Sequence, residues 1–472
     1  MLLSPFMFNK SLISSLTQEK LFLCFAVSFG LMFLLITPPF QAPDEGNHYF
    51  RAFQVSEGRL KAEKQDDGVG GTLPASLLYT FQHVSRDIPF HPENKQKIGD
   101  ILSLIDLPLQ KKEREFIHFP NTALYSPVPY LPQASGIFVG KLFGLSPILL
   151  MYMGRVSNLL VWLILIYLAI KITPVYKWVF LLLSLTPMSL FQAASLSADV
   201  FTNGISFLFI SLILQIAYGE KKTPSSHIIY LLILLTVLLS LSKQVYFILP
   251  LLFLIIPRNK IGSLKKYYAL FLLLFFLSLA SMMFWYFSVS DISREVFRIY
   301  LPNTKPAVHP GKQVSFILSY PVKFLEIMVN TFMREGRGYL EQFIGILGWL
   351  DTKLPGFIIN SYLAVLCVIA LIENRKNIRI SIKDKLILFC TSVICIVLVF
   401  LAMYIGWSRV GYNFIEGVQG RYFIPISPVI FLLLYNKKIT VGTERVRWKI
   451  FISSFVLLVL SWTVYVLIKR YY

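Results

Sequence analysis

The chain has 472 residues, of which 56% are hydrophobic, and its formal net charge at pH 7 is +20. Repeated apolar runs exclude a soluble globular protein, because about 20 consecutive apolar residues are what one membrane-spanning helix needs. The positive charge does not indicate nucleic-acid binding, since most Lys and Arg residues lie in short connections between apolar runs. Such basic loops are typical of the cytoplasmic face, where they contact anionic lipids. The sequence predicts an all-α polytopic membrane protein with membrane lipids, and no nucleic acid, as partners.

The apolar runs predict about eleven transmembrane helices, within a range of ten to thirteen. We expect them near residues 21–39, 146–170, 178–194, 200–218, 228–242, 244–257, 268–289, 355–372, 385–405, 421–435 and 450–468. Basic connections occur at 171–177, 220–222, 258–266, 375–385 and 437–449. If residues 1–20 are cytoplasmic, all five connections fall on the cytoplasmic face. Residues 21–472 then form a single transmembrane domain.

Two long connections, 41–145 and 290–354, fall on the extracytoplasmic face in this arrangement. Between Gln41 and Pro120 the chain carries twelve of its 25 acidic residues and ten basic ones. This near balance of charge predicts a small folded cap rather than a disordered tail. In the second connection, residues 339–350 are apolar but short, which indicates a re-entrant or interfacial segment.

The stretch PDEGNH directly follows the first apolar run and contains Asp44, Glu45 and His48, with Arg51 close behind. Neighbouring carboxylates can supply a general base, shift each other's pKa or hold a divalent cation. Asp44 is alternatively an N-cap of a following helix, because Asp is a favoured capping residue. The sequence leaves both interpretations open.

Four further polar segments are expected on the same face: SLSADVFTNG (195–204), SLSKQVYFILP (240–250), MREGRGYLEQ (333–342) and EGVQGRYFIP (416–425). Three of them have a simple alternative explanation: Asp199 as a helix cap, Lys243 as a residue that reaches the membrane interface, Arg421 as a helix-flanking anchor. Taken together, carboxylates and cations at a membrane surface suit a lipid phosphate, which Arg binds through two hydrogen bonds.

Several blocks of the sequence resemble the DUF2142 family of bacterial membrane proteins. They are PPFQAPDEGNHYFRAFQVSEG, YSPVPYLPQASGIFVGKLFGLS, GRVSNLL, LTPMSLFQAASLSADVFTNG, LSKQVYFILPLLFLIIP and VQGRYFIPISP, and the resemblance runs from about residue 35 to 430. That family is similar to the GT-C superfamily of glycosyltransferases that use polyprenyl-phosphate-linked sugars. The resemblance implies a GT-C-like architecture in the bacterial cytoplasmic (inner) membrane, with a large first extracytoplasmic loop and the active site outside. It also implies an acidic catalytic residue after the first helix, which is Asp44, with Glu45 as its partner or substitute.

We therefore expect an inverting GT-C-type glycosyltransferase that moves a sugar from a polyprenyl-phosphate donor to a cell-envelope glycan or polymer, such as a cell-wall polysaccharide. The predicted catalytic residues are Asp44 and Glu45, which also hold Mg or Mn if the reaction depends on a divalent cation; no other cofactor is expected. The predicted substrate-binding residues are His48, Arg51, Tyr125, Gln133, Ser197, Asp199, Lys243, Tyr246, Arg334, Arg337, Gln419, Arg421 and Tyr422. The alternatives are a transporter or flippase for a lipid-linked glycan, for which Arg155 is the best charged residue within a span, and a non-catalytic envelope-assembly scaffold.

Overall fold

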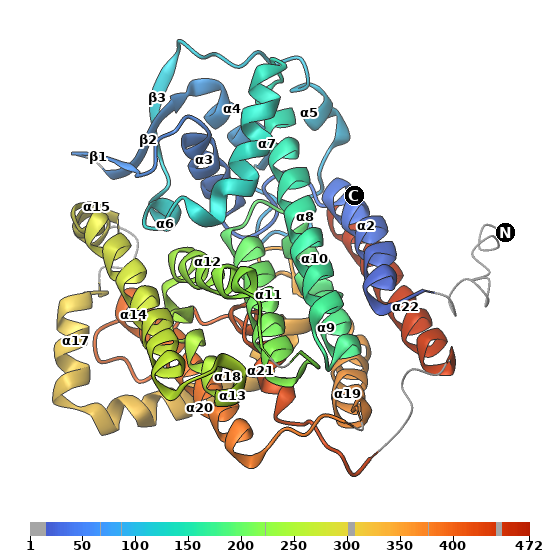
Figure 1. Cartoon of the computed structure of the whole chain (residues 1–472). Coiled ribbons are helices and arrows are strands. Elements are labelled where there is room, and N and C mark those ends of the chain that lie inside the picture. Colours follow the sequence, from blue (N-terminus) through green and yellow to red (C-terminus); the bar gives the residue numbers. More distant parts are fainter. Residues whose placement is uncertain are drawn as a thin grey trace.

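A computed structural model describes residues 16–66, 68–85, 87–221, 223–300, 307–375, 377–439 and 446–472. Residues 1–15 of the predicted cytoplasmic N-terminus lie outside these ranges. Helices dominate the described chain (Figure 1), and α22 lies beside α2 although the two come from opposite ends of the sequence. The fold therefore closes on itself, with its last helix packed against its first long one.

Six helices of the described chain are long and apolar enough to cross a membrane. They are α2 (Gln18–Ile36), α8 (Pro147–Ile172), α11 (Ala198–Tyr218), α14 (Leu264–Ser288), α20 (Ile382–Gly406) and α22 (Val446–Tyr471). Each overlaps one of the predicted spans. A bent pair, α17 (Pro310–Ser319) and α18 (Pro321–Gly345), meets at 107° and becomes a seventh candidate if it is counted as one span. The protein is thus a multi-pass membrane protein by helix length and composition.

The prediction of about eleven spans is not confirmed, because the other five apolar runs form short or interrupted helices. These are α9 (Lys177–Ser184) with α10 (Pro187–Ala193), α12 (Ser226–Ser242), η2 (Gln244–Tyr246) with η3 (Leu249–Ile255), α19 (Gly356–Ile372), and η5 (Gly420–Phe423) with α21 (Ser427–Leu432). Prolines at 187, 250 and 428 explain three of the interruptions, since proline lacks an N–H and is tolerated only in the first turn of a helix. Mean hydropathy does not register such breaks.

Burial differs sharply among the long helices. In the most apolar 18-residue window of α11, 89% of the residues are buried inside the protein, compared with 17% in α14. Helix α11 packs against both α8 and α12 and carries polar side chains such as Thr202 and Asn203. The first of the polar clusters described below stands at its N-terminus.

The first long connection is folded and covers one end of the bundle (Figure 1). Its elements are α3 (Glu45–Ser56), β1 (Glu63–Gln65), β2 (Gly68–Pro74), α4 (Ala75–Ser85), α5 (Ile98–Leu102), β3 (Arg114–His118), α6 (Pro120–Ala123), η1 (Val128–Tyr130) and α7 (Leu131–Leu142). The strands form an antiparallel sheet in the order β1-β2-β3, in which Gly70 pairs with both Glu63 and His118. We call this segment, residues 41–145, the cap.

The second long connection is largely helical. It contains α15 (Ser290–Glu295), η4 (Val296–Tyr300), α17, α18 and a hairpin of β4 (Ile346–Leu347) and β5 (Thr352–Lys353), and a short helix α13 (Arg258–Ile261) precedes α14. The apolar stretch 339–350 is therefore the end of α18 followed by the β4–β5 hairpin. Helix α18 turns Phe324, Ile327 and Thr331 inward and exposes both charged and apolar residues on its other side.

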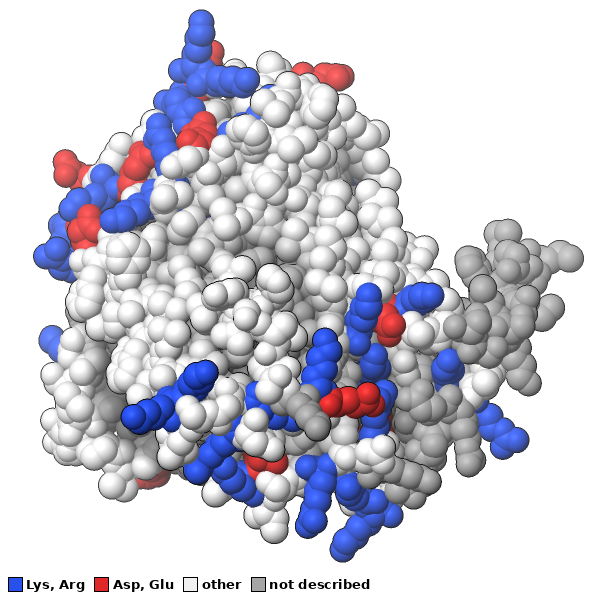
Figure 2. Space-filling view, in the orientation of Figure 1, with Lys and Arg blue, Asp and Glu red and all other residues white. Residues whose placement is uncertain are grey.

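The two ends of the molecule differ in their charged side chains. In Figure 2, blue side chains outnumber red ones at the lower end, blue and red mix over the cap, and the surface between is mostly white. We call the lower end the basic face. One groove there is lined by Lys171, Lys177, Lys221 and Arg375. The opposite end, with the cap, is the cap face.

Candidate functional site

Asp199, Lys243 and Arg421, which lie far apart in the sequence, meet at the cap face. Lys243 donates from Nζ to Oδ1 of Asp199 at 2.8 Å, and Nε of Arg421 lies 4.0 Å from Oδ2 of the same carboxylate. The Lys243 ammonium also sits 4.2 Å from the centre of the Tyr422 ring, at cation–π distance. Two cations against one carboxylate leave this cluster with a net charge of +1.

Local structure explains how these side chains arrive there. Ser197 is the N-cap of α11 and accepts from the backbone N–H of Asp199 at 3.2 Å, so Asp199 is not the cap and its carboxylate is available to Lys243. Gln192, which the sequence analysis missed, donates to Oδ2 of Asp199 at 3.3 Å. Since Gln192 lies in the last turn of the short α10 rather than in a continuous span, hydropathy gave no signal for it.

The η5 turn brings Arg421 close because residue 420 is glycine. A Cβ at Gly420 would lie 2.0 Å from the carbonyl oxygen of Tyr339 in α18, so only glycine allows this approach. The backbone N–H of Gly420 donates to Gln342 at 2.8 Å, and Tyr246 donates to the carbonyl of Tyr422 at 2.5 Å. The predicted residues Tyr246 and Tyr422 thus belong to the framework that holds Arg421.

Arg421 is buried but incompletely paired. Its side chain is 9% exposed, and its Nε has no hydrogen-bond partner among the described residues; the same holds for Oε1 of Gln419. That N–H faces Oδ2 of Asp199 at 4.0 Å, too far for a hydrogen bond, so Arg421 is paired with this carboxylate by charge but not by a hydrogen bond. Arg421 lines a narrow crevice of about 10 Å³, which is room for about one water molecule. Pro43 and Leu350 also border it, so the crevice reaches the residue before Asp44.

Asp44 occupies the N-cap position of α3 without capping it. Its backbone is left-handed, with φ of 59°, and its side chain makes no capping hydrogen bond. Oδ1 instead accepts from Nδ2 of Asn121 at 3.0 Å, and the residue is only half-buried. The capping interpretation is therefore wrong. The sequence gave no signal for Asn121, which lies 77 residues further along the chain.

His48 lies within electrostatic range of both Asp44 and Asp199. Its Nδ1 lies 2.8 Å from the hydroxyl of Tyr130, and its ring meets the edge of Tyr125 at 6.1 Å between centres. Burial lowers the pKa of His48 to about 4, although Asp44 and Asp199 both act in the opposite direction. The imidazole is therefore neutral at pH 7. Burial likewise raises the pKa of Tyr125 to about 12.

Glu45, which was predicted as a catalytic partner or metal ligand, makes structural contacts. Arg155 donates to both of its oxygens, from Nε to Oε1 at 2.8 Å and from NH2 to Oε2 at 2.6 Å, and the backbone N–H of Leu196 also donates to Oε1. The remaining Arg155 donors bind three carbonyls at and just beyond the end of α2. Both oxygens of the buried Glu45 thus face donors of Arg155 and Leu196 rather than a site shared with Asp44.

Arg51 and Gln133 position other elements. Arg51 is fully buried and donates to Gln54 at 2.6 Å and to the carbonyl of Leu60 at 2.5 Å, which fixes the chain after α3. Gln133 donates to the carbonyl of Ser197 at 3.0 Å and so joins α7 to the start of α11. Both residues thus hold neighbouring elements in place rather than belonging to the Asp199–Lys243–Arg421 cluster.

Arg334 and Arg337 are not brought into the cluster, contrary to the prediction. Their side chains are 73% and 78% exposed on α18. Arg334 lies 3.5 Å from Glu335 and over the ring of Phe414, and Arg337 lies 3.3 Å from Glu341. Because α18 is helical here, these side chains point away from the face that contacts η5.

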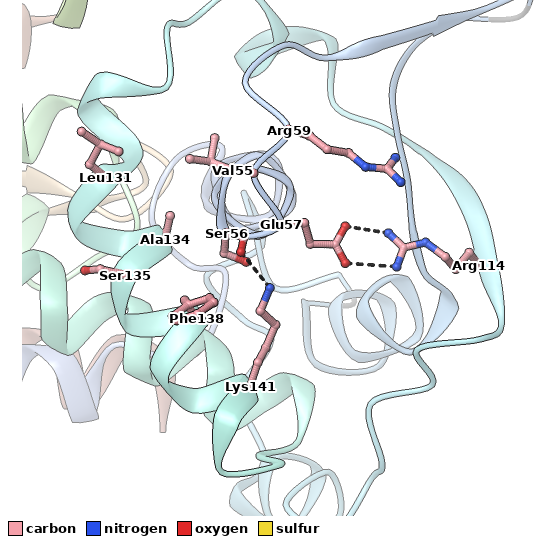
Figure 3. A pocket seen from close by; sticks show the side chains of 11 residues that line it. Val55, Ser56, Glu57, Arg59, Arg114, Leu131, Ala134, Ser135, Phe138 and Lys141 are labelled. Carbon is pink, nitrogen blue, oxygen red and sulfur yellow. Dashed lines mark hydrogen bonds and ion pairs between the residues drawn. The ribbon is translucent and has the colours of Figure 1, made fainter.

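A wider groove, of about 870 Å³, lies at the other end of α3 (Figure 3). Its charged side chains already have partners in the chain: Arg114 donates to both oxygens of Glu57, Arg59 pairs with Glu63, and Lys141 donates to the carbonyl of Ser56. This groove therefore lacks the unpaired donor that distinguishes the crevice beside Arg421. In the described part of the chain, no group of three or more His, Cys, Asp or Glu side chains is placed to hold a metal ion.

Comparison with known proteins gives one match. The family model described as "Predicted membrane protein (DUF2142)" matches residues 27–430. No curated protein and no solved structure matches the chain. The matched segment contains Asp44, Asp199, Lys243 and Arg421. The chain therefore belongs to the DUF2142 family of predicted membrane proteins.

Proposed function

We propose that the protein is a membrane glycosyltransferase of GT-C type, which moves a sugar from a polyprenyl-phosphate donor to a cell-envelope glycan or polymer. One observation carries the proposal. A buried cluster with a net charge of +1 and an unpaired donor on Arg421 borders the same crevice as Pro43, the neighbour of the half-exposed Asp44. Asp44 and Arg421 also act on the same imidazole, since Asp44 raises the pKa of His48 and Arg421 lowers it, which supports placing both at one site.

The charge of the cluster suits both the bound lipid phosphodiester and the lipid phosphate that leaves when the sugar is transferred. The phosphodiester of a polyprenyl-phosphate sugar carries one negative charge, which matches the single excess positive charge of Asp199, Lys243 and Arg421. When the sugar leaves, the phosphate gains a second charge. Arg421 and Lys243 then stabilise the leaving group more strongly than the bound donor, which is how such cations accelerate a displacement.

Asp44 supplies the base in this proposal. The acceptor hydroxyl oxygen attacks the anomeric carbon, the bond from that carbon to the phosphate oxygen breaks, and the lipid phosphate keeps the electron pair. The hydroxyl proton passes to Asp44. One displacement inverts the anomeric configuration. Asn121, by donating to Oδ1 at 3.0 Å, orients the carboxylate.

The depth of the site supports a donor that is embedded in lipid. Arg155, which holds Glu45 next to Asp44, and Lys171 at the basic end lie sixteen residues apart in one helix, which is about 24 Å. The hydrocarbon core of a bilayer is about 30 Å thick. With the basic face in the cytoplasm, the cluster lies near the opposite headgroup level, where a lipid phosphate resides. We place the protein accordingly in the bacterial cytoplasmic membrane, with its N-terminus inside and the site outside.

The structure removes the main support for the transporter alternative. It depended on Arg155 as a charge available within a span, but Arg155 is fully buried and its donors bind Glu45 and backbone carbonyls. A non-catalytic scaffold would not require the unpaired donor of Arg421. The glycosyltransferase proposal accounts for both observations.

The test compares surface glycans from a strain lacking the gene with those from strains carrying wild-type or Asp44→Asn protein. Mass spectrometry is expected to show a sugar that the deletion removes, that the wild type restores and that Asp44→Asn does not restore at equal protein level. Unchanged glycans in the deletion strain would refute the proposal. Full restoration by Asp44→Asn would show that Asp44 is not the base and would contradict the proposed mechanism.

A further inference from the structure

Two aromatic side chains from distant segments meet beside the crevice. The rings of Phe90, in the cap, and Trp349, in the β4–β5 turn, have centres 5.3 Å apart and planes inclined at 58°. Phe90 is 64% exposed. Trp349 stands between Gly348 and Leu350, both of which line the crevice together with Arg421. The ring pair therefore marks the rim of the candidate site.

Backbone strain gathers at this rim. Of the five non-glycine residues with positive φ in the described chain, Phe40, Phe90 and Leu350 have φ values of 67°, 65° and 66°. Bulky L-residues avoid this region because Cβ meets the following carbonyl oxygen, and such strain is found mainly where function requires it. The strained segments contact one another, since Nε1 of Trp349 donates to the carbonyl of Phe40 at 3.3 Å.

An ion pair holds the two loops together. Oδ2 of Asp351 accepts from the backbone N–H of Phe90 at 3.3 Å and from NH2 of Arg470 at 2.8 Å. Arg470 also donates to the carbonyl of Ile88 at 2.9 Å. The ring pair is thus presented on a fixed support rather than on two independent loops.

The surroundings of the rings are polar. His91 and Glu93, which follow Phe90, have side chains that are 55% and 68% exposed, so this surface faces water rather than hydrocarbon.

We infer that Phe90 and Trp349 form a carbohydrate-binding platform at the cap face, on which a sugar chain lies beside the candidate site. A sugar ring presents apolar C–H faces and a polar hydroxyl edge. Aromatic rings cover the faces, and the exposed side chains of His91 and Glu93 beside Phe90 offer polar partners for the hydroxyls. The inference rests on the proposed function in one respect: the sugar chain is the acceptor, whose hydroxyl reaches Asp44.

The test measures binding of the surface glycan purified from the deletion strain to the purified full-length protein by titration calorimetry. Phe90→Ala and Trp349→Ala are expected to weaken binding about tenfold each, from lost ring contact. Trp349→Phe keeps a ring and is expected to retain most of the affinity. The matched control is Phe357→Ala, because Phe357 is also 64% exposed and pairs with Trp462 at 5.8 Å, but does not line the crevice.

The outcomes separate the inference from the proposed function. Unchanged glycan affinity in both Phe90→Ala and Trp349→Ala, or no binding by the wild type, overturns the platform. Glycan binding that both substitutions weaken, in a protein that transfers no sugar, supports the platform and refutes the enzyme. If Phe90→Ala instead weakens binding to phosphatidylglycerol vesicles and leaves glycan binding intact, the rings contact the membrane and the inference is wrong.

Discussion

Arg155 and Glu45 form a buried ion pair that reaches from α8 to the first residue of α3, with hydrogen bonds of 2.8 and 2.6 Å and no exposed side-chain surface on either partner. The pair gives two adjacent carboxylates different roles. Glu45 fixes the start of α3 against the end of α2, and Asp44, one residue earlier, is left half-exposed beside Asn121.

The first prediction concerns this pair. Glu45→Gln leaves the Arg155 guanidinium buried without a counter-charge, which typically costs about 3–5 kcal/mol of stability. We expect a large fall in the thermal midpoint and in the amount of inserted protein. Glu326→Gln is the control, because Glu326 pairs with Lys323 on an exposed surface and should change little. A Glu45→Gln protein as stable as the wild type would contradict the structural role.

Asp44→Asn is expected to behave in the opposite way. The substitution keeps the size of the side chain but removes the base, so turnover should fall about 10²–10⁴-fold while protein level and thermal midpoint stay near those of the wild type. Sugar transfer by membranes containing equal amounts of each protein gives the measurement. Transfer at the wild-type rate would exclude Asp44 as the base.

Arg421 is predicted to bind the donor phosphate. Arg421→Lys replaces a planar fork with a point charge and should impair transfer, and Arg421→Ala should raise the donor KM further. Arg337→Ala is the matched control, since Arg337 is an exposed arginine outside the cluster. An unchanged donor KM in Arg421→Ala would remove Arg421 from the site.

His48 should make stability depend on pH. Because burial lowers its pKa from about 6.5 to about 4, the unfolded chain binds a proton that the folded protein refuses between these values. Its contribution to stability is complete above pH 6.5 and is lost as the pH falls towards 4, by about 3 kcal/mol in total. Thermal midpoints measured from pH 7 to pH 4 should therefore fall less steeply in His48→Gln. Identical slopes would show that His48 is not the group responsible.

The proposed orientation is tested with single cysteines in a cysteine-free background. Gly311 lies at the start of α17 and Ser263 precedes α14, and both residues are exposed. In intact cells, an impermeant thiol reagent should label Gly311→Cys and leave Ser263→Cys unlabelled. Labelling of Ser263→Cys from outside would invert the topology and place the cluster in the cytoplasm.

The meeting of Asp199, Lys243 and Arg421 was predicted from sequence, because their polar segments were expected on one face, although the eleven spans behind that expectation are not confirmed. Which of these groups pair with one another was not predictable. Partner choice depends on the angle of each residue around its helix and on side contacts such as Gly420 against α18. Glu45 and Arg155 illustrate this, since both were noticed but assigned to separate alternatives. The number of spans failed for a related reason, because composition does not reveal where an apolar run bends.

The unequal burial of α11 and α14 has a consequence for the environment of the protein. Since α11 is enclosed by protein and α14 is not, α14 is expected to contact lipid chains over most of its surface and α11 over very little. Changes in acyl-chain length or fluidity act directly on α14 and reach α11 only through its neighbours. A photoactivatable lipid should therefore mark α14 heavily and α11 hardly at all. The residues that start α11, including Asp199, are therefore positioned by protein contacts rather than by lipid.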